Sequence, residues 1–292
     1  MAPDLCPLCG ASLDPGRGFA VDGCSYARCP GCHAHVLIPL PLPETLAVFY
    51  RDAYYPVFAS LEASPRRQAM LRRLLAQIPR RPPGRLLDVG CGGGHLLAHA
   101  RAAGWEVAGV DPSADGCAQA RAQYGIQVEA APLEAAALPE ASFDVVTLVN
   151  VLDQAPDPVA LLRAARRALR PRGLLVARVP NGDFHRIAWG LLRRLPLPAA
   201  RRLRRLLIFH PICLNARALH ALLARAGLGH VRIGNAPISG AEWSVPQGVA
   251  GRALLACLAA VARAGAGAAA GVTSRRLLCG PSLLGLAERE AG

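Results

Sequence analysis

The sequence predicts an α/β fold with a mostly parallel sheet and a small cysteine-bearing module at its N-terminus. Three observations lead to this prediction. A short apolar run at 85–89 ends in a glycine-rich turn and continues into a helical pattern. Strand and helix patterns then alternate up to residue 182, as a parallel sheet with helical crossovers requires. Two Cys-x-x-Cys pairs lie within the first 32 residues.

Composition limits the expected partners. The chain has 292 residues, enough for one large domain and a small one, and its formal net charge is +13. Every basic residue is arginine, which indicates a compositional bias, so this charge favours anionic partners but is weak evidence for nucleic acid. The first residues lack the pattern of a signal peptide, so we expect a cytoplasmic chain with reduced thiols.

The N-terminal cysteines are spaced like zinc ligands. Cys6 and Cys9 form one pair, Cys29 and Cys32 form the other, and nineteen residues separate the pairs. Two facing turns of this kind supply the four thiolates that Zn²⁺ takes at closed, structural sites. Because such a site has no open coordination position, we assign the zinc to structure or recognition and not to catalysis. Redox-active cysteines are the alternative.

The segment from Asp88 to Gly94 reads D-V-G-C-G-G-G and lies between a strand pattern and a helical one. Glycines allow the sharp turn and the close approach of a ligand that nucleotide-binding strand–turn–helix units need. A dinucleotide fingerprint would place its third glycine at position 95, where this chain has histidine. A second strand pattern, at 105–110, ends in Asp111, which is placed to accept hydrogen bonds from ribose hydroxyls.

Together, the D-x-G-x-G-x-G motif and the acidic strand end resemble class I S-adenosylmethionine-dependent methyltransferases over residues 84–182. The resemblance implies a seven-stranded Rossmann-like sheet, mostly parallel with an antiparallel last strand, and S-adenosyl-L-methionine as cofactor. A glycine loop without a ligand is the alternative. The cofactor contacts that the resemblance implies are Asp88, Gly90, Gly92, Gly94, Asp111, Leu133, Glu134 and Asn150.

The loop after Asn150 departs from the family pattern, which is close to V-L-E-H-x-x-D-P. This chain has Asp153 at the position of the acid and Gln154 at the position of the histidine. The change removes the histidine that this loop would use for proton transfer. His185 and His210 are the remaining candidates for a catalytic base, although a histidine in such a place is more often a surface or structural residue.

The expected elements follow the alternation in order. A helix at 64–79 has Ser64 as N-cap and Pro65 at its first position, and the run 143–150 is nearly all apolar, like a buried parallel strand. Further strands are expected at 126–129, 174–179, 231–233 and 281–289, the last of them antiparallel to its neighbours. Further helices are expected at 113–124, 159–170 and 215–226.

We expect a zinc-ribbon module at 1–40, linking helices at 41–83, and a methyltransferase domain at 84–292 with insertions at about 184–212 and 246–275. Residues 36–55 resemble a subgroup of the family that carries an N-terminal zinc ribbon and modifies sugars, lipids or secondary metabolites. In that subgroup, tyrosines like Tyr50, Tyr54 and Tyr55 line the cofactor mouth; packing within a linking helix is the alternative.

The arginine-rich, apolar insertion at 184–212 has three interpretations: a lid packed on the domain, a segment lying on an anionic membrane, and a basic groove for RNA. We favour the lid. The apolar run 253–262 is too short for a membrane span, which needs about 20 residues, and suits an interfacial helix.

The sequence therefore favours methyl transfer to a small-molecule, lipid or saccharide acceptor, at oxygen. One alternative is an rRNA or tRNA methyltransferase that uses the zinc ribbon for RNA. The other is a non-catalytic interaction protein that binds the cofactor, for which the changed loop at 150–154 is the reason.

Overall fold

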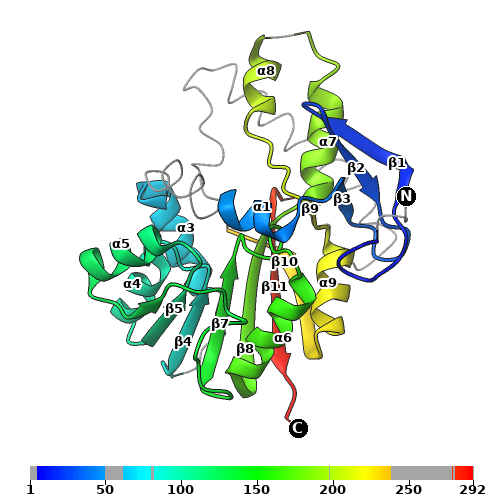
Figure 1. The fold of residues 1–292 in the computed structure, drawn as a ribbon. Helices are drawn as coiled ribbons and strands as arrows, with labels where there is room; N and C mark the ends of the chain where they lie inside the picture. Colours follow the sequence, from blue (N-terminus) through cyan, green and yellow to red (C-terminus); the bar gives the residue numbers. More distant parts are fainter. Residues whose placement is uncertain are drawn as a thin grey trace, which may run out of the picture.

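The computed structural model describes residues 5–49, 62–79, 82–196, 198–237, 278 and 280–291. These residues form a four-stranded sheet, in the order β1-β2-β3-β9, and a seven-stranded sheet, in the order β10-β11-β8-β7-β4-β5-β6 (Figure 1). The strands of the large sheet are β4 (Arg85–Val89), β5 (Glu106–Val110), β6 (Val128–Glu129), β7 (Phe143–Val149), β8 (Leu169–Pro180), β10 (Leu228–Asn235) and β11 (Ser282–Arg289).

The large sheet confirms the predicted fold class. Strands β4, β5, β6, β7 and β8 pair in parallel, and β11 is antiparallel to both of its neighbours, β8 and β10. The last strand therefore lies inside the sheet, beside β10 as expected, and β10 forms the edge.

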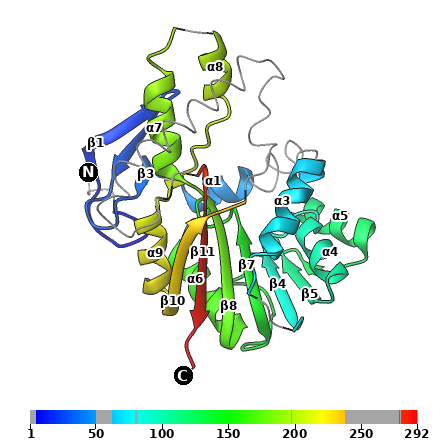
Figure 2. The ribbon, with the colours of Figure 1, turned by 180° about the vertical axis from the view of Figure 1, so that it is seen from behind.

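Helices cover both faces of the large sheet (Figure 2). On one face, α3 (Pro65–Leu75), α4 (His95–Ala102) and α5 (Ala114–Tyr124) pack on strand residues such as Leu86 and Val145. On the other face, α6 (Pro158–Ala168) and α9 (Ala216–Arg225) share a core with Leu148 and Leu175. The buried run in β7 thus contributes to two cores, which explains why it is apolar on both sides.

Some element bounds differ from the expectation. The helix predicted at 64–79 begins with the Ser64 cap but ends at Leu75, where a turn follows. The strand expected at 174–179 begins earlier, at Leu169 of β8, because Leu169 already pairs with Phe143, and the helix expected at 159–170 accordingly ends at Ala168. The tyrosines Tyr50, Tyr54 and Tyr55 and the insertion at 246–275 lie outside the described residues.

The small sheet contains the predicted cysteine module. Its strands are β1 (Asp14–Val21), β2 (Cys24–Arg28), β3 (His35–Ile38) and β9 (Ile212–Cys213). The last of these comes from the 184–212 insertion, so the module and the large domain share one sheet. The cysteine module also packs into the core under α6 and α9, through side chains that include Leu8 and Val36.

The four predicted zinc ligands meet at one point. The sulfur atoms of Cys6, Cys9, Cys29 and Cys32 all lie within 4.8 Å of one another. Those of Cys6 and Cys32 are 3.6 Å apart, and those of Cys9 and Cys29 are 3.4 Å apart. A tetrahedral Zn²⁺ with bonds of about 2.3 Å has sulfur–sulfur edges of roughly 3.8 Å, so the cluster fits a closed zinc site.

Two further helices and α1 (Pro43–Val48) lie beyond the carboxyl ends of the parallel strands (Figure 1). Helices α7 (Gly182–Leu192) and α8 (Pro198–Arg204) form a hairpin held by Leu192, Ala200 and Leu203. Among the described helices, none combines the length and the apolar character that a bilayer span requires.

We expect purified protein to contain one zinc ion per chain, bound by the four clustered thiolates. Cys6→Ser removes one ligand and should lose the metal, whereas Cys24→Ser changes an exposed cysteine outside the cluster and should keep it. Elemental analysis by mass spectrometry measures both. A wild-type protein without zinc would contradict the assignment.

Candidate active site

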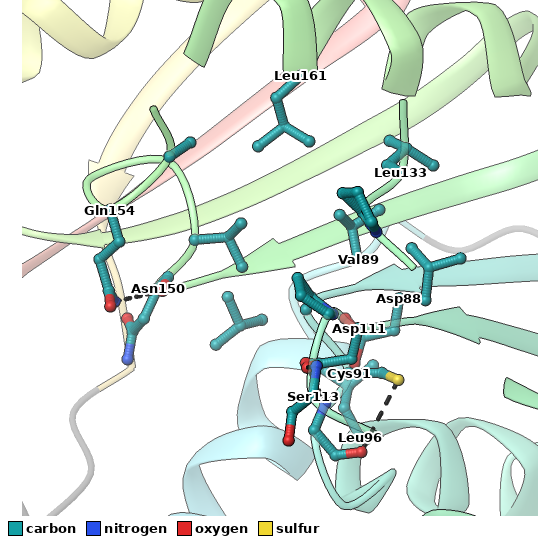
Figure 3. Close-up of a pocket in the computed structure, with 18 of the residues that line it drawn as sticks. Asp88, Val89, Cys91, Leu96, Asp111, Ser113, Leu133, Asn150, Gln154 and Leu161 are labelled. Carbon is teal, nitrogen blue, oxygen red and sulfur yellow. Dashed lines mark hydrogen bonds between the residues drawn. The ribbon is translucent and has the colours of Figure 1, made fainter. Parts of the chain in front are cut away.

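A pocket of about 230 Å³ lies where β4, β5 and β7 end (Figure 3). Strand β4 has β5 on one side and β7 on the other, so the order in which successive strands are added to the sheet reverses at β4. Open α/β sheets bind ligands at such switch points, beyond the carboxyl ends of the strands. The pocket is therefore where the fold itself predicts a nucleotide-like ligand.

Seven of the eight predicted cofactor contacts line this one pocket. They come from the turn after β4, the end of β5, the loop after β6 and the end of β7. They are Asp88, Gly90, Gly92, Asp111, Leu133, Glu134 and Asn150.

The eighth predicted contact, Gly94, lies at the start of α4 and does not line the pocket. A Cβ atom at Gly94 would lie 2.9 Å from the Cβ of Ala120, and its φ of 75° is strained for any other residue. This glycine therefore allows α4 and α5 to pack closely.

The acidic end of β5 holds the glycine turn in shape. The carboxylate of Asp111 accepts the Gly92 amide at one oxygen, over 2.8 Å, and the Ser113 amide at the other, also over 2.8 Å. Burial raises the pKa of Asp111, and these two amides oppose that shift. Each carboxylate oxygen keeps a free lone pair, so Asp111 can also accept hydrogen bonds from a diol.

Close approach of the backbone is required at Gly90. Its φ is 72°, and a Cβ atom would lie 2.5 Å from Cγ2 of Val151 in the loop after β7. Its amide donates to the Val110 carbonyl over 2.8 Å. The turn after β4 therefore lies directly against the loops that close the pocket, and only glycine fits there.

Asp88 lies at the base of the pocket and is almost fully buried. The hydroxyl of Thr147 on β7 donates to it over 2.6 Å. Burial, opposed by the Thr147 hydrogen bond and assisted by the charge of Asp111, raises the pKa of Asp88 to about 7. Because opposite charges favour the ionised form, a cationic ligand in the pocket would shift Asp88 back towards its carboxylate.

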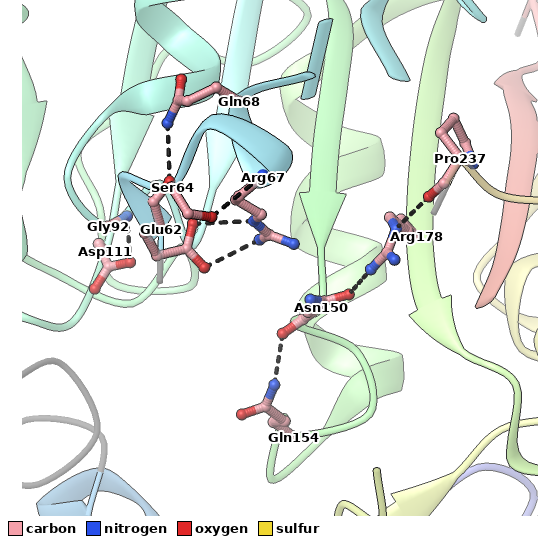
Figure 4. A network of polar contacts seen from close by, with 10 residues as sticks. All are labelled: Glu62, Ser64, Arg67, Gln68, Gly92, Asp111, Asn150, Gln154, Arg178 and Pro237. Atoms are coloured by element: carbon pink, nitrogen blue, oxygen red, sulfur yellow. Dashed lines mark hydrogen bonds and ion pairs between the residues drawn. The ribbon is translucent and has the colours of Figure 1, made fainter. Parts of the chain in front are cut away.

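An ion pair at the start of α3 forms one rim of the pocket (Figure 4). Arg67 donates to both carboxylate oxygens of Glu62, over 3.1 and 3.2 Å, and its side chain is buried. No sequence pattern indicates these two residues, because a Glu and an Arg near a helix start are typical of any exposed helix.

The opposite rim is held by a buried arginine, Arg178 of β8 (Figure 4). Its guanidinium donates to Oδ1 of Asn150 over 2.6 Å, to Oγ of Ser282 over 2.9 Å and to the carbonyl of Pro237. Gln154 donates to the carbonyl of Asn150 over 2.7 Å. Asn150, with a φ of 60°, is thereby fixed between β8 and the changed loop.

The two candidate bases have different surroundings. Both ring nitrogens of His185 have partners, the Pro281 carbonyl at 3.0 Å and the Ile208 amide at 3.3 Å, and burial lowers its pKa to about 4. His210 pairs through Nδ1 with the carboxylate of Asp153 and is partly exposed. Neither histidine lines the pocket, but Gln154, the residue after Asp153, does, so the Asp153–His210 pair lies next to the pocket rim.

Comparisons with known proteins agree with this geometry. A family described as a methyltransferase domain matches residues 63–232. A ubiquinone biosynthesis O-methyltransferase of Ruegeria pomeroyi is 36% identical over 113 residues, which is 37% of this chain and 46% of that protein. The chain thus spans about half the length of the curated relatives it matches.

Solved structures show the same fold at low identity. A Thermotoga maritima methyltransferase, described as a possible histamine N-methyltransferase, has a TM-score of 0.53 at 16% identity and covers 81% of this chain and 99% of its own. Phosphoethanolamine N-methyltransferase 2 of Haemonchus contortus, solved with S-adenosyl-L-methionine, has a TM-score of 0.52 at 14% identity and covers 88% of this chain and 62% of its own. The family match spans more than half of the chain, which therefore belongs to the methyltransferase-domain family and has the fold of class I S-adenosylmethionine-dependent methyltransferases.

Proposed function

We propose that the pocket binds S-adenosyl-L-methionine and that the protein transfers its methyl group to an oxygen of a small-molecule acceptor. The observation that carries this proposal is the gathering of seven predicted contacts around one pocket, with Asp111 bonded to the glycine turn. Oxygen is favoured because ubiquinone biosynthesis O-methyltransferases are among the curated relatives that match.

Each part of the pocket suits one part of the cofactor. Asp111 accepts hydrogen bonds from the ribose hydroxyls. Leu133 and Leu161 offer apolar surface to the adenine, and Glu134 lies beside them. Asp88 and the rim around Asn150 face the charged methionine portion.

The bound cofactor supplies a methyl group on a positively charged sulfur, which is electrophilic without further activation. The residues of the chain therefore act mainly by orienting the acceptor against that group. Correct alignment of two reactants can lower a barrier by up to about 7–11 kcal/mol. The buried Arg178 supports this alignment, because it fixes Asn150 at the rim.

The test is transfer of a labelled methyl group from S-adenosyl-L-methionine to a panel of phenols, glycosides, lipids and bulk RNA. We expect transfer to oxygen in one of the small-molecule classes. Asp111→Ala should weaken cofactor binding roughly tenfold or more, because ribose hydroxyls lose a buried partner. Asp115→Ala, an exposed residue at the start of α5, is the matched control and should bind normally.

Transfer to RNA alone, with an affinity that falls steeply with salt, would favour the RNA methyltransferase instead. Cofactor binding without transfer to any member of the panel would favour the non-catalytic interaction protein. Unchanged cofactor affinity in the Asp111 variant would show that the ribose is held elsewhere.

Besides the lid that the sequence favours for the 184–212 insertion, we also propose that the α7–α8 hairpin brings the protein to anionic membranes and apolar acceptors. Ile187, Leu191 and Leu195 are 53%, 43% and 39% exposed, and the first two lie one helical turn apart. Exposed arginines surround this apolar stripe, as in helices that lie on anionic lipid. The exposed arginines are Arg193, Arg194, Arg201, Arg202 and Arg205.

Vesicles of phosphatidylglycerol and phosphatidylcholine test this contact by co-sedimentation. We expect the protein to bind the anionic vesicles and to bind neutral ones less. Leu191→Glu should reduce binding, while Leu5→Glu, which changes an exposed leucine of the cysteine module, should not. Equal recovery of both variants with the vesicles would contradict a contact through the hairpin.

A further inference from the structure

Asp153 and His210 form a pair whose geometry is that of a general base and its partner. Asp153 lies in the loop after β7, and its side chain is 2% exposed; the side chain of His210 is 27% exposed. Nδ1 of His210 hydrogen-bonds Oδ2 of Asp153. A carboxylate only accepts hydrogen bonds, so the proton lies on Nδ1 and the lone pair of Nε2 is available. No hydrogen bond to Nε2 is found within the described part of the chain.

The second oxygen of Asp153 strengthens this assignment. Oδ1 is buried and has no hydrogen-bond partner among the described residues. A buried carboxylate with an unmatched oxygen is costly, and a positive charge on its neighbour offsets that cost. The pair is therefore arranged to stabilise the imidazolium that forms when Nε2 takes a proton.

Three other titratable groups of the described residues lie around the pair, and none of them is negatively charged. Asp153 is therefore the negative charge that His210 faces. His185 of α7 is kept neutral by burial, which lowers its pKa to about 4. Burial raises the pKa of Cys213 of β9, so this residue is a thiol. Arg178 of β8 carries a positive charge and is bonded to Asn150 and to Ser282.

The cysteine module fixes the segment that carries His210. On one side of the histidine, the ring of Phe209 packs 5.6 Å from that of Phe19 and 6.2 Å from that of Tyr26. On the other side, the carbonyl of Pro211 accepts the amide of Leu37 over 2.8 Å.

Strand pairing extends this attachment to both members of the pair. Strand β9 follows His210 and pairs with β3, with Cys213 opposite His35 and Ile212 opposite Val36. The amide of Ile212 also donates to the carbonyl of Asp153 over 3.2 Å. The fold of the cysteine module, which the metal would stabilise, therefore sets where both side chains lie.

We propose that His210 is the general base of the methyl transfer, positioned by Asp153 and held in place by the four-cysteine module. This inference rests on the proposed function and names its acceptor class as a hydroxyl compound that must lose a proton. The acceptor oxygen forms a bond to the methyl carbon while the carbon–sulfur bond breaks and its electron pair stays on sulfur. The hydroxyl proton passes to Nε2 of His210.

The geometric part of the inference is tested by nuclear magnetic resonance of ¹⁵N-labelled histidine side chains in the zinc-loaded protein. We expect a strongly downfield Nδ1–H resonance that disappears in His210→Gln and in Asp153→Asn. His220→Gln, which changes an exposed histidine on α9, should leave it in place. Removal of zinc by a chelator, and Phe209→Ala with zinc retained, should each broaden or shift it.

The catalytic part uses catechol as the acceptor probe. We expect His210→Gln to lower kcat by about 10²–10⁴-fold, to remove the acid limb of the pH–kcat profile, and to leave cofactor affinity within roughly twofold. Asp153→Asn should act in the same direction, and His220→Gln should match the wild type.

The outcomes separate this inference from the proposed function. Absence of the downfield resonance in the wild type, or normal turnover by His210→Gln, overturns the role of His210 while the methyltransferase assignment stands. Persistence of the resonance after zinc removal overturns the positioning by the cysteine module. Failure of the wild type to bind S-adenosyl-L-methionine, with the resonance present, overturns the proposed function instead.

Discussion

The hydrogen bond from the Gly92 amide to the Asp111 carboxylate joins the ends of the neighbouring strands β4 and β5, where the pocket lies. It links the turn after β4 to the end of β5. The same carboxylate accepts the amide of Ser113, the N-cap residue of α5. Because the turn also passes close to Val151 at Gly90, only glycine fits at that position. The shape of the glycine turn and the proposed binding of a ribose therefore depend on the same partly buried acid.

The other half of the site depends on long-range contacts. Arg178 bonds the end of β7 to β11, and β9 carries the His210 segment into the sheet of the cysteine module. In the proposed mechanism, a metal outside the pocket would affect catalysis without touching a substrate. The proposed cofactor contacts and the proposed base therefore come from different parts of the chain.

This division explains what the sequence could predict. The glycine turn, the Asp111 strand end and the cysteine pairs are local patterns, and the structure places them as their spacing indicates. The pairing of Asp153 with His210 spans 57 positions and that of Arg178 with Ser282 spans 104, so no local pattern could indicate either. The sequence leaves His210 as a candidate base after the change at Gln154, but it could not indicate that Asp153 of the same loop would be its partner.

The most direct test of the account is calorimetric titration of the zinc-loaded protein with S-adenosyl-L-methionine and, in parallel, with NAD. The D-x-G-x-G-x-G turn and the histidine at position 95 predict micromolar binding of S-adenosyl-L-methionine and no measurable binding of NAD. Binding of NAD, or of neither compound, would contradict the assignment of the pocket.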